Sequence, residues 1–504
     1  MEKFIPDLNE FLNLSKKNSV VSVKTYLVSD MLTPVSLYKK LVKDDEGFLL
    51  ESVDHSGSFS RYSILGFGAA DKVICIDNKI TLGGNLSLEK FNRDEKILDF
   101  LDSLLSCYQF TSADEDLPVS AGVVGYLGYD VIREVEYLPD VPVDDQRLPL
   151  AALFITGFLL IFDHYKQKVT LIKNLYLDSL KEKGDDVLTE VYTNAIAEIQ
   201  QVVEKIQSPE SPDPEGFIGS DETLEIERTF SDNEFELAVE AAKEHILVGD
   251  AFQIVLSQRF DFKIECDPFE IYRVLRQVNP SPYLYYLKFD EVTVVGASPE
   301  PLVKVVNNRV ISRPIAGTRP RGKTEKEDRK LGAELLEDPK ELAEHMMLVD
   351  LARNDIGRIA EFGSISIDEL MTIERYSHVI HITSQVSGTL KENLTPIDVI
   401  RATLPAGTLS GAPKVRAMEI IDELEKTKRG IYAGVIGYIG FDSKLDVAIA
   451  IRTLVIKPNM EASVQAGAGI VIESDPTNEN LECQAKAGAI LKAVKMANFK
   501  FNNK

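Results

Sequence analysis

Two pairs of glutamates have a spacing that could do chemistry. Glu341 and Glu344 lie three residues apart in DPKELAEHMMLVDLARND, and Glu479 and Glu482 lie three apart in NENLECQAKAGAILKAV. Both segments predict helices, and residues three apart share one helix face. Two like charges side by side are unfavourable, more so when desolvated, so a compensating cation is expected. Mg²⁺, which prefers oxygen ligands, could be held between two such helices.

Ordinary helix structure offers another interpretation of three of these carboxylates. Asp338 and Pro339 are typical of a helix start, and Glu341 then stands at the third helical position, close to a capping box. Glu482 can pair with Lys486 four residues later. Glu344 has no such explanation, since it lies one turn further into a helix whose apolar spacing predicts that it is largely buried.

Glycine-rich strands and one arginine predict a binding surface. QAGAGIV (465–471) and YAGVIGYIG (432–440) would let a ligand approach the backbone, although a tight strand crossing explains them equally well. Arg452 stands in the apolar run AIAIRT, and a buried arginine needs an anionic partner. That partner could be a core aspartate or a substrate carboxylate.

Residues 317–324, GTRPRGKT, match the pattern of a nucleotide-binding loop. Pro320 lacks the N–H that a phosphate cradle needs, and Pro314 interrupts the preceding strand. An NTPase is therefore a remote alternative.

The elements that must position these residues predict an α+β fold, with layered antiparallel sheets flanked by helices. Short strand-like runs recur at 47–53, 72–77, 121–129, 150–165, 291–297, 434–441 and 447–456, and helical patterns at 186–206, 232–250, 267–278 and 413–426. The strands are not separated by regular crossover helices, which favours this class over a doubly wound one. Residues 207–224, rich in Pro, Ser and acids, predict a linker between an N-terminal lobe (1–206) and a catalytic region (225–497).

Composition restricts the class of protein. A formal net charge of −24 argues against a nucleic-acid-binding surface, so an anionic substrate would need cations gathered locally. The four cysteines show no metal-binding spacing, and we find neither a signal peptide nor a long apolar run. We expect a cytoplasmic protein with no membrane association.

The longer motifs resemble the chorismate-utilising enzymes, and within them component I of the anthranilate synthases. They are PIAGTRPRG, LAEHMMLVDLARNDIGR, ERYSHVIHITSQVSG, LPAGTLSGAPKVRAMEIIDELE, RGIYAGVIGYIGFD, AIAIRT and QAGAGIV, which span most of 225–497. The N-terminal half matches through LLESV and RYSILG. The resemblance implies the fold of that family and lyase activity in tryptophan biosynthesis.

The resemblance also implies a site that holds Mg²⁺ and chorismate. Glu344 and Glu482 match the main metal ligands, and Glu341 and Glu479 match supporting carboxylates. The implied substrate contacts are Gly317, Thr318, Tyr432, Arg452, Gly467, Ala468, Gly469 and Lys486. Catalysis is assigned to Glu300 as general acid, to His381 beside the reacting ring, and to Thr318.

Two positions distinguish the related activities. Aminodeoxychorismate synthases carry an attacking lysine where this chain has Ala316, and isochorismate and salicylate synthases carry a water-activating lysine where it has Gln253. Both residues favour anthranilate as the product over these alternatives.

The resemblance implies two further binding partners. No amidotransferase nucleophile is visible, so ammonia should come from glutamine through a glutamine amidotransferase subunit in a hetero-oligomer. Tryptophan is expected as a feedback inhibitor, bound by Glu51 and Ser52 in the first half and by Pro282, Tyr283 and Leu284 in the second.

Overall fold

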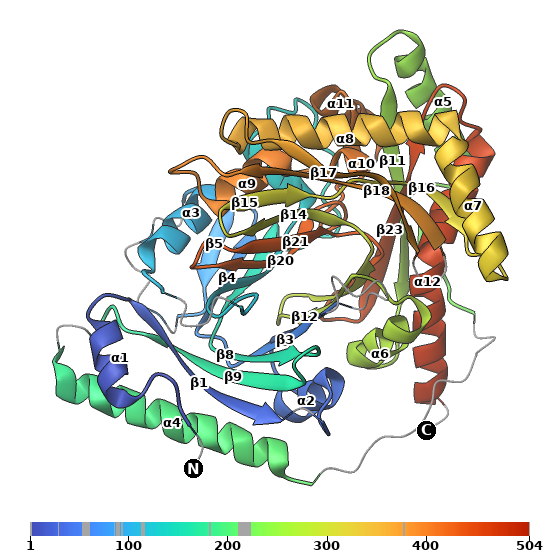
Figure 1. The fold of residues 1–504 in the computed structure, drawn as a ribbon. Coiled ribbons are helices and arrows are strands. Elements are labelled where there is room, and N and C mark those ends of the chain that lie inside the picture. Colours follow the sequence, from blue (N-terminus) through green and yellow to red (C-terminus); the bar gives the residue numbers. More distant parts are fainter. Residues whose placement is uncertain are drawn as a thin grey trace.

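The computed structural model describes residues 3–28, 30–52, 61–84, 86, 91, 94–111, 116–180, 183–209, 223–375 and 379–502. Most of the predicted linker, 210–222, lies outside these residues. Within them the α+β prediction is confirmed, because the strands form two large antiparallel sheets with helices on their outer faces (Figure 1). No helix of this part is long and apolar enough to cross a membrane.

The first sheet has 12 strands among the described residues. Their order is β1 (Val20–Val28), β9 (Lys168–Tyr176), β8 (Phe158–Asp163), β3 (Tyr62–Phe67), β2 (Gly47–Glu51), β12 (Tyr283–Lys288), β13 (Thr293–Ser298), β22 (Thr453–Ile456), β23 (Glu461–Ile470), β11 (Gln253–Lys263) and β10 (Glu227–Arg228), with β19 (Gly411–Ala412) beside β11.

The second sheet has 11 strands in the same part of the chain. Their order is β16 (Ile315–Pro320), β18 (Val379–Thr389), β15 (Arg309–Ser312), β14 (Pro301–Val306), β21 (Leu445–Ile449), β20 (Val435–Gly440), β6 (Gly122–Leu127), β7 (Ala151–Ile155), β4 (Asp71–Ile76) and β5 (Lys79–Leu82), with β17 (Ser366–Arg375) beside β18.

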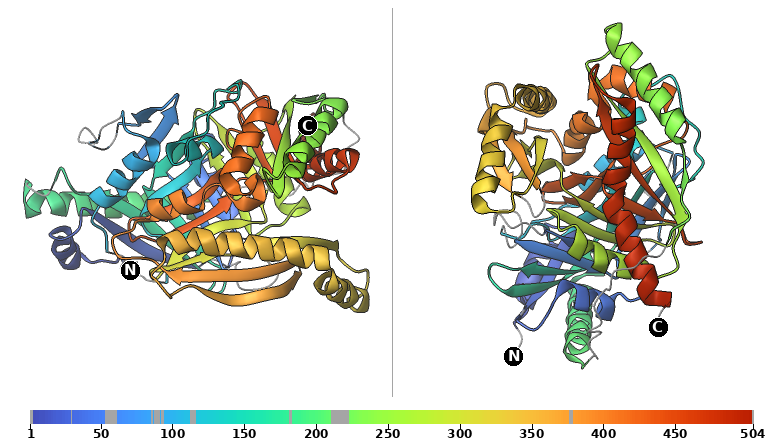
Figure 2. Two further views of the ribbon diagram at one scale, coloured as in Figure 1. Left: turned by 90° about the horizontal axis from the view of Figure 1, so that it is seen from above. Right: turned by 90° about the vertical axis from the view of Figure 1, so that its right-hand side faces the viewer.

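The two sheets pack face to face, and helices cover their outer faces. Strand β12 shows the arrangement: Tyr285 and Leu287 belong to a core shared with the second sheet, whereas Leu284 and Tyr286 face the helices, as strand alternation requires. The helices are α1 (Leu8–Ser15), α2 (Pro34–Leu41), α3 (Ile97–Cys107), the 3₁₀ helix η1 (Tyr129–Glu134), α4 (Asp185–Gln207), α5 (Asp232–Leu247), α6 (Pro268–Val278), α7 (Glu325–Glu337), α8 (Pro339–Ile359), α9 (Pro396–Thr403), α10 (Gly407–Ser410), α11 (Lys414–Leu424) and α12 (Pro476–Asn502). In Figures 1 and 2, α12 (red) runs along the outside of the first sheet, and α8 (yellow) lies over the second.

The predicted boundary between residues 1–206 and 225–497 does not divide the sheets. In the first sheet β2 pairs with β12, with Glu51 opposite Leu284. In the second sheet β6 pairs with β20, with Tyr126 opposite Ile436. Each sheet is therefore built from both halves, and the segments LLES and PSPYL meet through this pairing.

Helix α8 is less buried than its apolar pattern predicts. Leu348, Val349 and Ile356 are buried, but Met346 and Met347 remain half-exposed. The helix covers one face of the second sheet and leaves its outer side to solvent, so the expectation of a largely buried helix was wrong.

Candidate functional site

A cavity of about 930 Å³ gathers almost all the residues that the sequence predicted for the active site. It lies among the N-terminal turns of α8 and α12 and the ends of β11, β16, β18 and β23. The predicted residues that line it are Glu300, Gly317, Thr318, Glu341, Glu344, His381, Tyr432, Arg452, Gly467, Gly469, Glu479, Glu482 and Lys486. The exception is Ala468, whose side chain is fully buried in a core beside Ile254 and Leu256.

The start of α8 combines the cap with the carboxylate pair. The Asp338 carboxylate accepts hydrogen bonds from the backbone N–H groups of Lys340 (3.0 Å) and Glu341 (3.4 Å), so the predicted N-cap is confirmed. The Glu341 side chain does not complete a capping box, because its carboxylate accepts from the Arg319 guanidinium at 2.7 Å. Glu344, one turn further, accepts from the Gln253 side-chain amide at 3.4 Å.

Helix α12 presents the second pair to the same cavity. Lys486 lies 2.6 Å from the Glu482 carboxylate, as the four-residue spacing allows. Burial, and then the charge of Glu482, raises the pKa of the Glu479 carboxyl, although a Ser474 hydrogen bond opposes the shift. A nearby cation would relieve this electrostatic cost.

The carboxylates fit Mg²⁺ by their chemistry and their placement. Within the described part of the chain, no three His, Cys, Asp or Glu side chains are close enough to hold an ion together. Mg²⁺ usually takes one or two protein carboxylates and completes its shell with water and substrate oxygens. One glutamate pair from each helix, both lining one cavity, suits that requirement.

Arg452 supplies a positive charge inside the cavity. It follows β21 with a left-handed backbone (φ 50°), which is uncommon for an arginine. No carboxylate of the described residues lies within ion-pair distance of its guanidinium, so the core-aspartate interpretation is not supported. A guanidinium without such a partner is suited to bind a substrate carboxylate.

The glycines of β23 leave room for the residues around them. A Cβ at Gly469 would lie 2.6 Å from the Gln253 amide nitrogen, and one at Gly467 would lie 2.7 Å from the Leu256 carbonyl oxygen of β11 and 2.8 Å from the Tyr432 hydroxyl. The Gly467 carbonyl also accepts a hydrogen bond from Lys486 at 2.9 Å. Side chains at these positions would displace cavity residues, so close approach explains both glycines.

Glu300 has the properties of an acid at neutral pH. It stands just before β14, where the Thr408 hydroxyl donates to its carboxyl group at 2.8 Å. Burial raises the pKa of this carboxyl to about 7, although Thr408, Lys486 and Arg452 all act in the opposite direction. A carboxyl with such a pKa carries a proton in part of the molecules at pH 7 and can donate it.

A bulge in β16 orients His381. The pairing with β18 shifts register between Ala316 and Thr318, and Gly317 adopts a φ of 65°. The Gly317 carbonyl accepts a hydrogen bond from Nδ1 of His381 at 3.0 Å, and the Thr318 hydroxyl lies 3.1 Å from the same nitrogen. In the neutral ring Nε2 is then the nitrogen that accepts a proton, and burial lowers the His381 pKa and favours that neutral form.

The apparent nucleotide-binding loop is contradicted by the structure. Residues 315–320 form strand β16, and the backbone N–H of Gly322 donates to the Asp328 carboxylate at 2.9 Å. The Arg321 guanidinium donates to the same carboxylate at 2.7 Å. Asp328 thus occupies the donors that a phosphate would need, so this segment does not form a nucleotide cradle.

The comparisons with known proteins agree with this geometry. Residues 48–492 match the family of chorismate binding enzymes. The chain belongs to this family. Anthranilate synthase component 1 of Acetivibrio thermocellus is 43% identical over 98% of this chain and 99% of its own length. The chloroplastic anthranilate synthase alpha subunit 1 of Arabidopsis thaliana is 39% identical over 99% and 89%. A solved structure of anthranilate synthase component I from Streptococcus pneumoniae matches with a TM-score of 0.75 and 38% identity, over 92% of this chain and 98% of that one.

This chorismate-binding enzyme has a second cavity, of about 300 Å³, at the junction of β2 and β12. It is lined by all five residues predicted for tryptophan: Glu51, Ser52, Pro282, Tyr283 and Leu284. The Glu51 carboxylate is already engaged, because it accepts from the Tyr272 hydroxyl at 2.5 Å and from Arg276 at 2.9 Å. Its neighbour Ser52 is half-exposed, so Ser52 offers the more accessible polar group.

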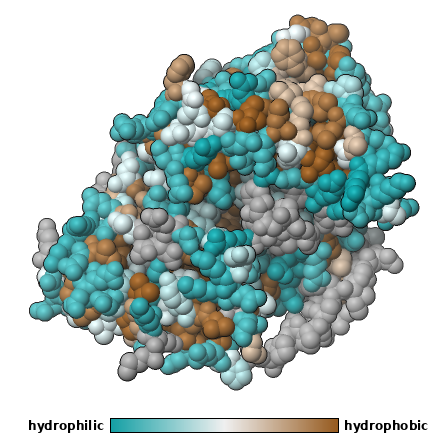
Figure 3. All heavy atoms as spheres, viewed as in Figure 1, coloured by the Kyte–Doolittle hydropathy of each residue, from teal (hydrophilic) through white to brown (hydrophobic). Residues whose placement is uncertain are grey.

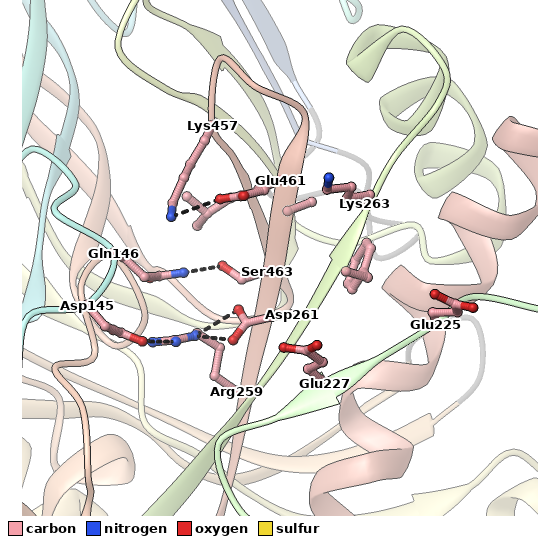
Figure 4. Close-up of a pocket in the computed structure, with 13 residues that line it drawn as sticks. Asp145, Gln146, Glu225, Glu227, Arg259, Asp261, Lys263, Lys457, Glu461 and Ser463 are labelled. Atoms are coloured by element: carbon pink, nitrogen blue, oxygen red, sulfur yellow. Dashed lines mark hydrogen bonds and ion pairs between the residues drawn. The ribbon is translucent and has the colours of Figure 1, made fainter.

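A third cavity of the enzyme, of about 560 Å³, lies farther along β11 and β23 (Figure 4). Arg259 there is bound by Asp145 and Asp261, and Lys457 by Glu461. Arg259 and Lys457 are therefore already neutralised by neighbouring carboxylates, whereas Lys263, Glu225 and Glu227 also line this cavity.

Sequence analysis missed two residues that support the active site. Thr408 binds Glu300, and its signal was the motif LPAGTLSGAPK, in which no role was given to the threonine. Arg319 forms ion pairs with both Asp338 and Glu341, and its signal was its position in the motif PIAGTRPRG. In the second cavity, Arg61 of RYSILG and Asp446 were likewise not predicted.

Proposed function

We propose that the chain converts chorismate and ammonia into anthranilate and pyruvate, as the large subunit of a two-subunit enzyme of tryptophan biosynthesis. The observation that carries the proposal is the content of the first cavity. The two glutamate pairs line one cavity with Arg452, Lys486, Glu300 and His381, and Ala316 and Gln253 stand there at the two positions that distinguish related activities. The relatives named anthranilate synthase support the same activity.

Substrate binding follows from the charges in the cavity. Chorismate is a dianion, and Arg452 and Lys486 supply positive charge within an otherwise acidic chain. Glu344 and Glu482, supported by Glu341 and Glu479, would hold Mg²⁺, which when bound neutralises these carboxylates and binds a substrate carboxylate. Tyr432, Gly467 and Gly469 line the same cavity and would contact the substrate.

The chemistry uses one acid and one base of the chain. Ammonia adds at C2 of chorismate, the ring double bond shifts, and the C4 hydroxyl takes a proton from Glu300 and leaves as water; the new ammonium group gives up one proton to water, and Glu300 is reprotonated from water. Pyruvate is then eliminated and the ring becomes aromatic. Nε2 of His381, whose ring is held by Gly317, is suited to accept the proton lost in that second step.

Ala316 and Gln253 select the nucleophile. Ala316 has no amine to attack the ring, and Gln253 is a neutral amide that cannot deprotonate water. Ammonia needs no base to become a nucleophile, so it reacts where water does not. Aminodeoxychorismate, isochorismate and salicylate synthesis are the alternatives that these two residues disfavour.

The first prediction concerns the product. Purified chain incubated with chorismate, Mg²⁺ and ammonium salt should form fluorescent anthranilate without a partner, while glutamine alone should give none. Fluorescence and mass analysis of the product provide the measurement. Formation of isochorismate, salicylate or an aminodeoxychorismate instead would reject the proposed function.

We also propose that the second cavity binds tryptophan and transmits feedback inhibition. It joins the two halves of the chain through the β2–β12 pairing. Pro282 lines both the second cavity and the active-site cavity, and Asn279 to Ser281 line the latter. A ligand that moves this turn would change the active site, which is the coupling of two sites that allostery requires.

The free thiols of all four cysteines suit the proposed cytoplasmic location.

The second prediction tests this cavity with Ser52→Phe. The substitution removes a hydroxyl and fills the space, so the tryptophan concentration for half-inhibition should rise by about 10-fold to 100-fold, the value of one buried hydrogen bond. Activity without tryptophan should stay close to that of the wild type. Inhibition curves on both proteins provide the measurement, and equal inhibition of the two would place tryptophan elsewhere.

A further inference from the structure

Four exposed apolar side chains gather where β11 and β23 leave the first sheet. They are Leu247 (68% exposed), Val248 (73%), Phe252 (75%) and Ile472 (41%), and we call them the apolar patch. Leu247 and Val248 end helix α5, Phe252 directly precedes β11, and Ile472 follows β23. Ile254 pairs with Ile470, so the two strands leave the sheet side by side. Figure 3 shows hydrophobic atoms at the top of the molecule, over the turn that joins α5 to β11.

The apolar patch lies on the outer side of the active-site wall. Gln253 lines the cavity while its neighbour Phe252 is exposed, and Val471 and Glu473 line it while Ile472 is exposed. Phe252 lies at a bend just before β11 and Ile472 lies in the turn just after β23, and each is a direct chain neighbour of a residue that lines the cavity, so the patch adjoins the cavity. Gln253 lines the cavity there, and its amide lies 3.4 Å from Glu344.

We propose that the apolar patch is the centre of the docking surface for the subunit that delivers ammonia, a proposal that rests on the proposed function. The chain shows no amidotransferase nucleophile: Cys75, Cys266 and Cys483 are buried, and Cys107 is half-exposed with no activating context in the sequence. Relatives carry the names component 1 and alpha subunit, which imply a second subunit.

The position of the apolar patch determines which occupant it fits. A subunit that supplies a small reactant must dock where a short path leads to the cavity, and the patch adjoins the wall that carries Gln253. A second copy of this chain would bring no reactant to that wall. Glu244 is exposed on α5 three residues before Leu247, on the same helix face, so we expect a partner face with an apolar centre and a basic residue at its rim. Four side chains can provide the centre of such an interface, whose total area must exceed roughly 1,000 Å².

The test compares two exposed phenylalanines in the full chain. Phe252→Lys places a charge in the patch, and Phe362→Lys makes the same change at a residue that is 107% exposed beyond the C-terminal end of α8. Helix α8 is about 30 Å long and meets the cavity at its other end, so Phe362 lies far from the wall. Leu247→Lys is a second patch variant, whose cation suits a helix C-terminus and so should not disturb folding.

The readouts separate docking from chemistry. Each variant is titrated with the purified cognate glutamine amidotransferase subunit, and anthranilate formation is measured with glutamine and, separately, with ammonium salt. We expect Phe252→Lys and Leu247→Lys to need at least tenfold more partner for half-maximal glutamine-dependent activity. Their ammonia-dependent activity should match that of the wild type, and Phe362→Lys should behave as the wild type in both assays.

Three results would overturn the proposal. Unchanged partner titrations of both patch variants would show that the partner docks elsewhere, and an equal loss in Phe362→Lys would show that the effect is not local. A wild-type dimer that Phe252→Lys dissociates would give the patch to a second copy of the chain. Absence of anthranilate from the wild type with ammonia would instead reject the proposed function itself, independently of the surface.

Discussion

Glu300→Gln should lower kcat for anthranilate formation by about 10²-fold to 10⁴-fold, the usual contribution of a general acid. The substitution preserves size and still lets the Thr408 hydroxyl donate to the side-chain oxygen, which it does now at 2.8 Å. The amide cannot give up a proton on the required timescale, so the C4 hydroxyl would have to leave without protonation. Steady-state rates at saturating chorismate, Mg²⁺ and ammonia provide the measurement.

The pH dependence of kcat tests whether Glu300 is the acid. The Glu300 pKa of about 7 means that the protonated form is present below pH 7 and is lost as the pH rises through that value. Wild-type kcat, corrected for the fraction of ammonia that is unprotonated, should therefore fall above about pH 7, and Glu300→Gln should lack this limb. Thr408→Val removes a hydrogen bond that favours the ionised carboxylate, so it should move the limb to higher pH. A limb that stays in Glu300→Gln would assign the proton to another group.

The local patterns predicted the elements better than they predicted the contacts between them. The helical periodicity at 186–206 and 267–278 corresponds to α4 and α6, because the recurrence of apolar residues every three to four positions is a local property of the sequence. The run 150–165 became two strands, β7 and β8, and 447–456 became β21 and β22, since turns inside apolar runs leave little trace in hydropathy. Register across the sheets joins positions hundreds of residues apart, such as Glu51 and Leu284, and no local pattern encodes it.

The candidate site shows the same division. Spacing alone predicted that Glu341 and Glu344 share a face, and Arg452 was predicted to need an anion because of its apolar neighbours. Spacing suggested that the two glutamate pairs could hold one ion between their helices, whereas the place of Arg452 in the same site came from the family resemblance, because it depends on how α8 and α12 approach the sheets. The environment of Glu300 also depends on contacts that only the folded chain forms. Thr408 is 108 residues away along the chain, and the burial that raises the Glu300 pKa comes from several elements.

Glu344→Gln and Glu482→Gln should each lower turnover by at least about 100-fold, because even residues that only support metal ligands change affinity or activity about 10-fold to 100-fold. The two residues stand on different helices, α8 and α12, where Glu344 accepts from Gln253 and Glu482 pairs with Lys486 rather than with each other. A shared ion is the physical reason for both to matter equally. Chorismate binding, measured by calorimetry with and without Mg²⁺, should lose its dependence on the metal in either variant.

A structural role for these glutamates predicts a different pattern. If Glu482 serves only to pair with Lys486, then Glu482→Gln should resemble the loss of another helical pair four residues apart, such as that of Glu325 with Arg329 on α7. Such exposed pairs stabilise a helix by about 0.2–0.5 kcal/mol and leave chemistry unchanged. Glu325→Gln is therefore the matched control and should keep wild-type rates and metal dependence. Near-normal turnover of Glu344→Gln and Glu482→Gln, with thermal stability equal to that of the control, would show that both residues have only a structural role in their helices. Loss of turnover with unchanged stability in both, and not in Glu325→Gln, would establish that the two helices act through a metal ion.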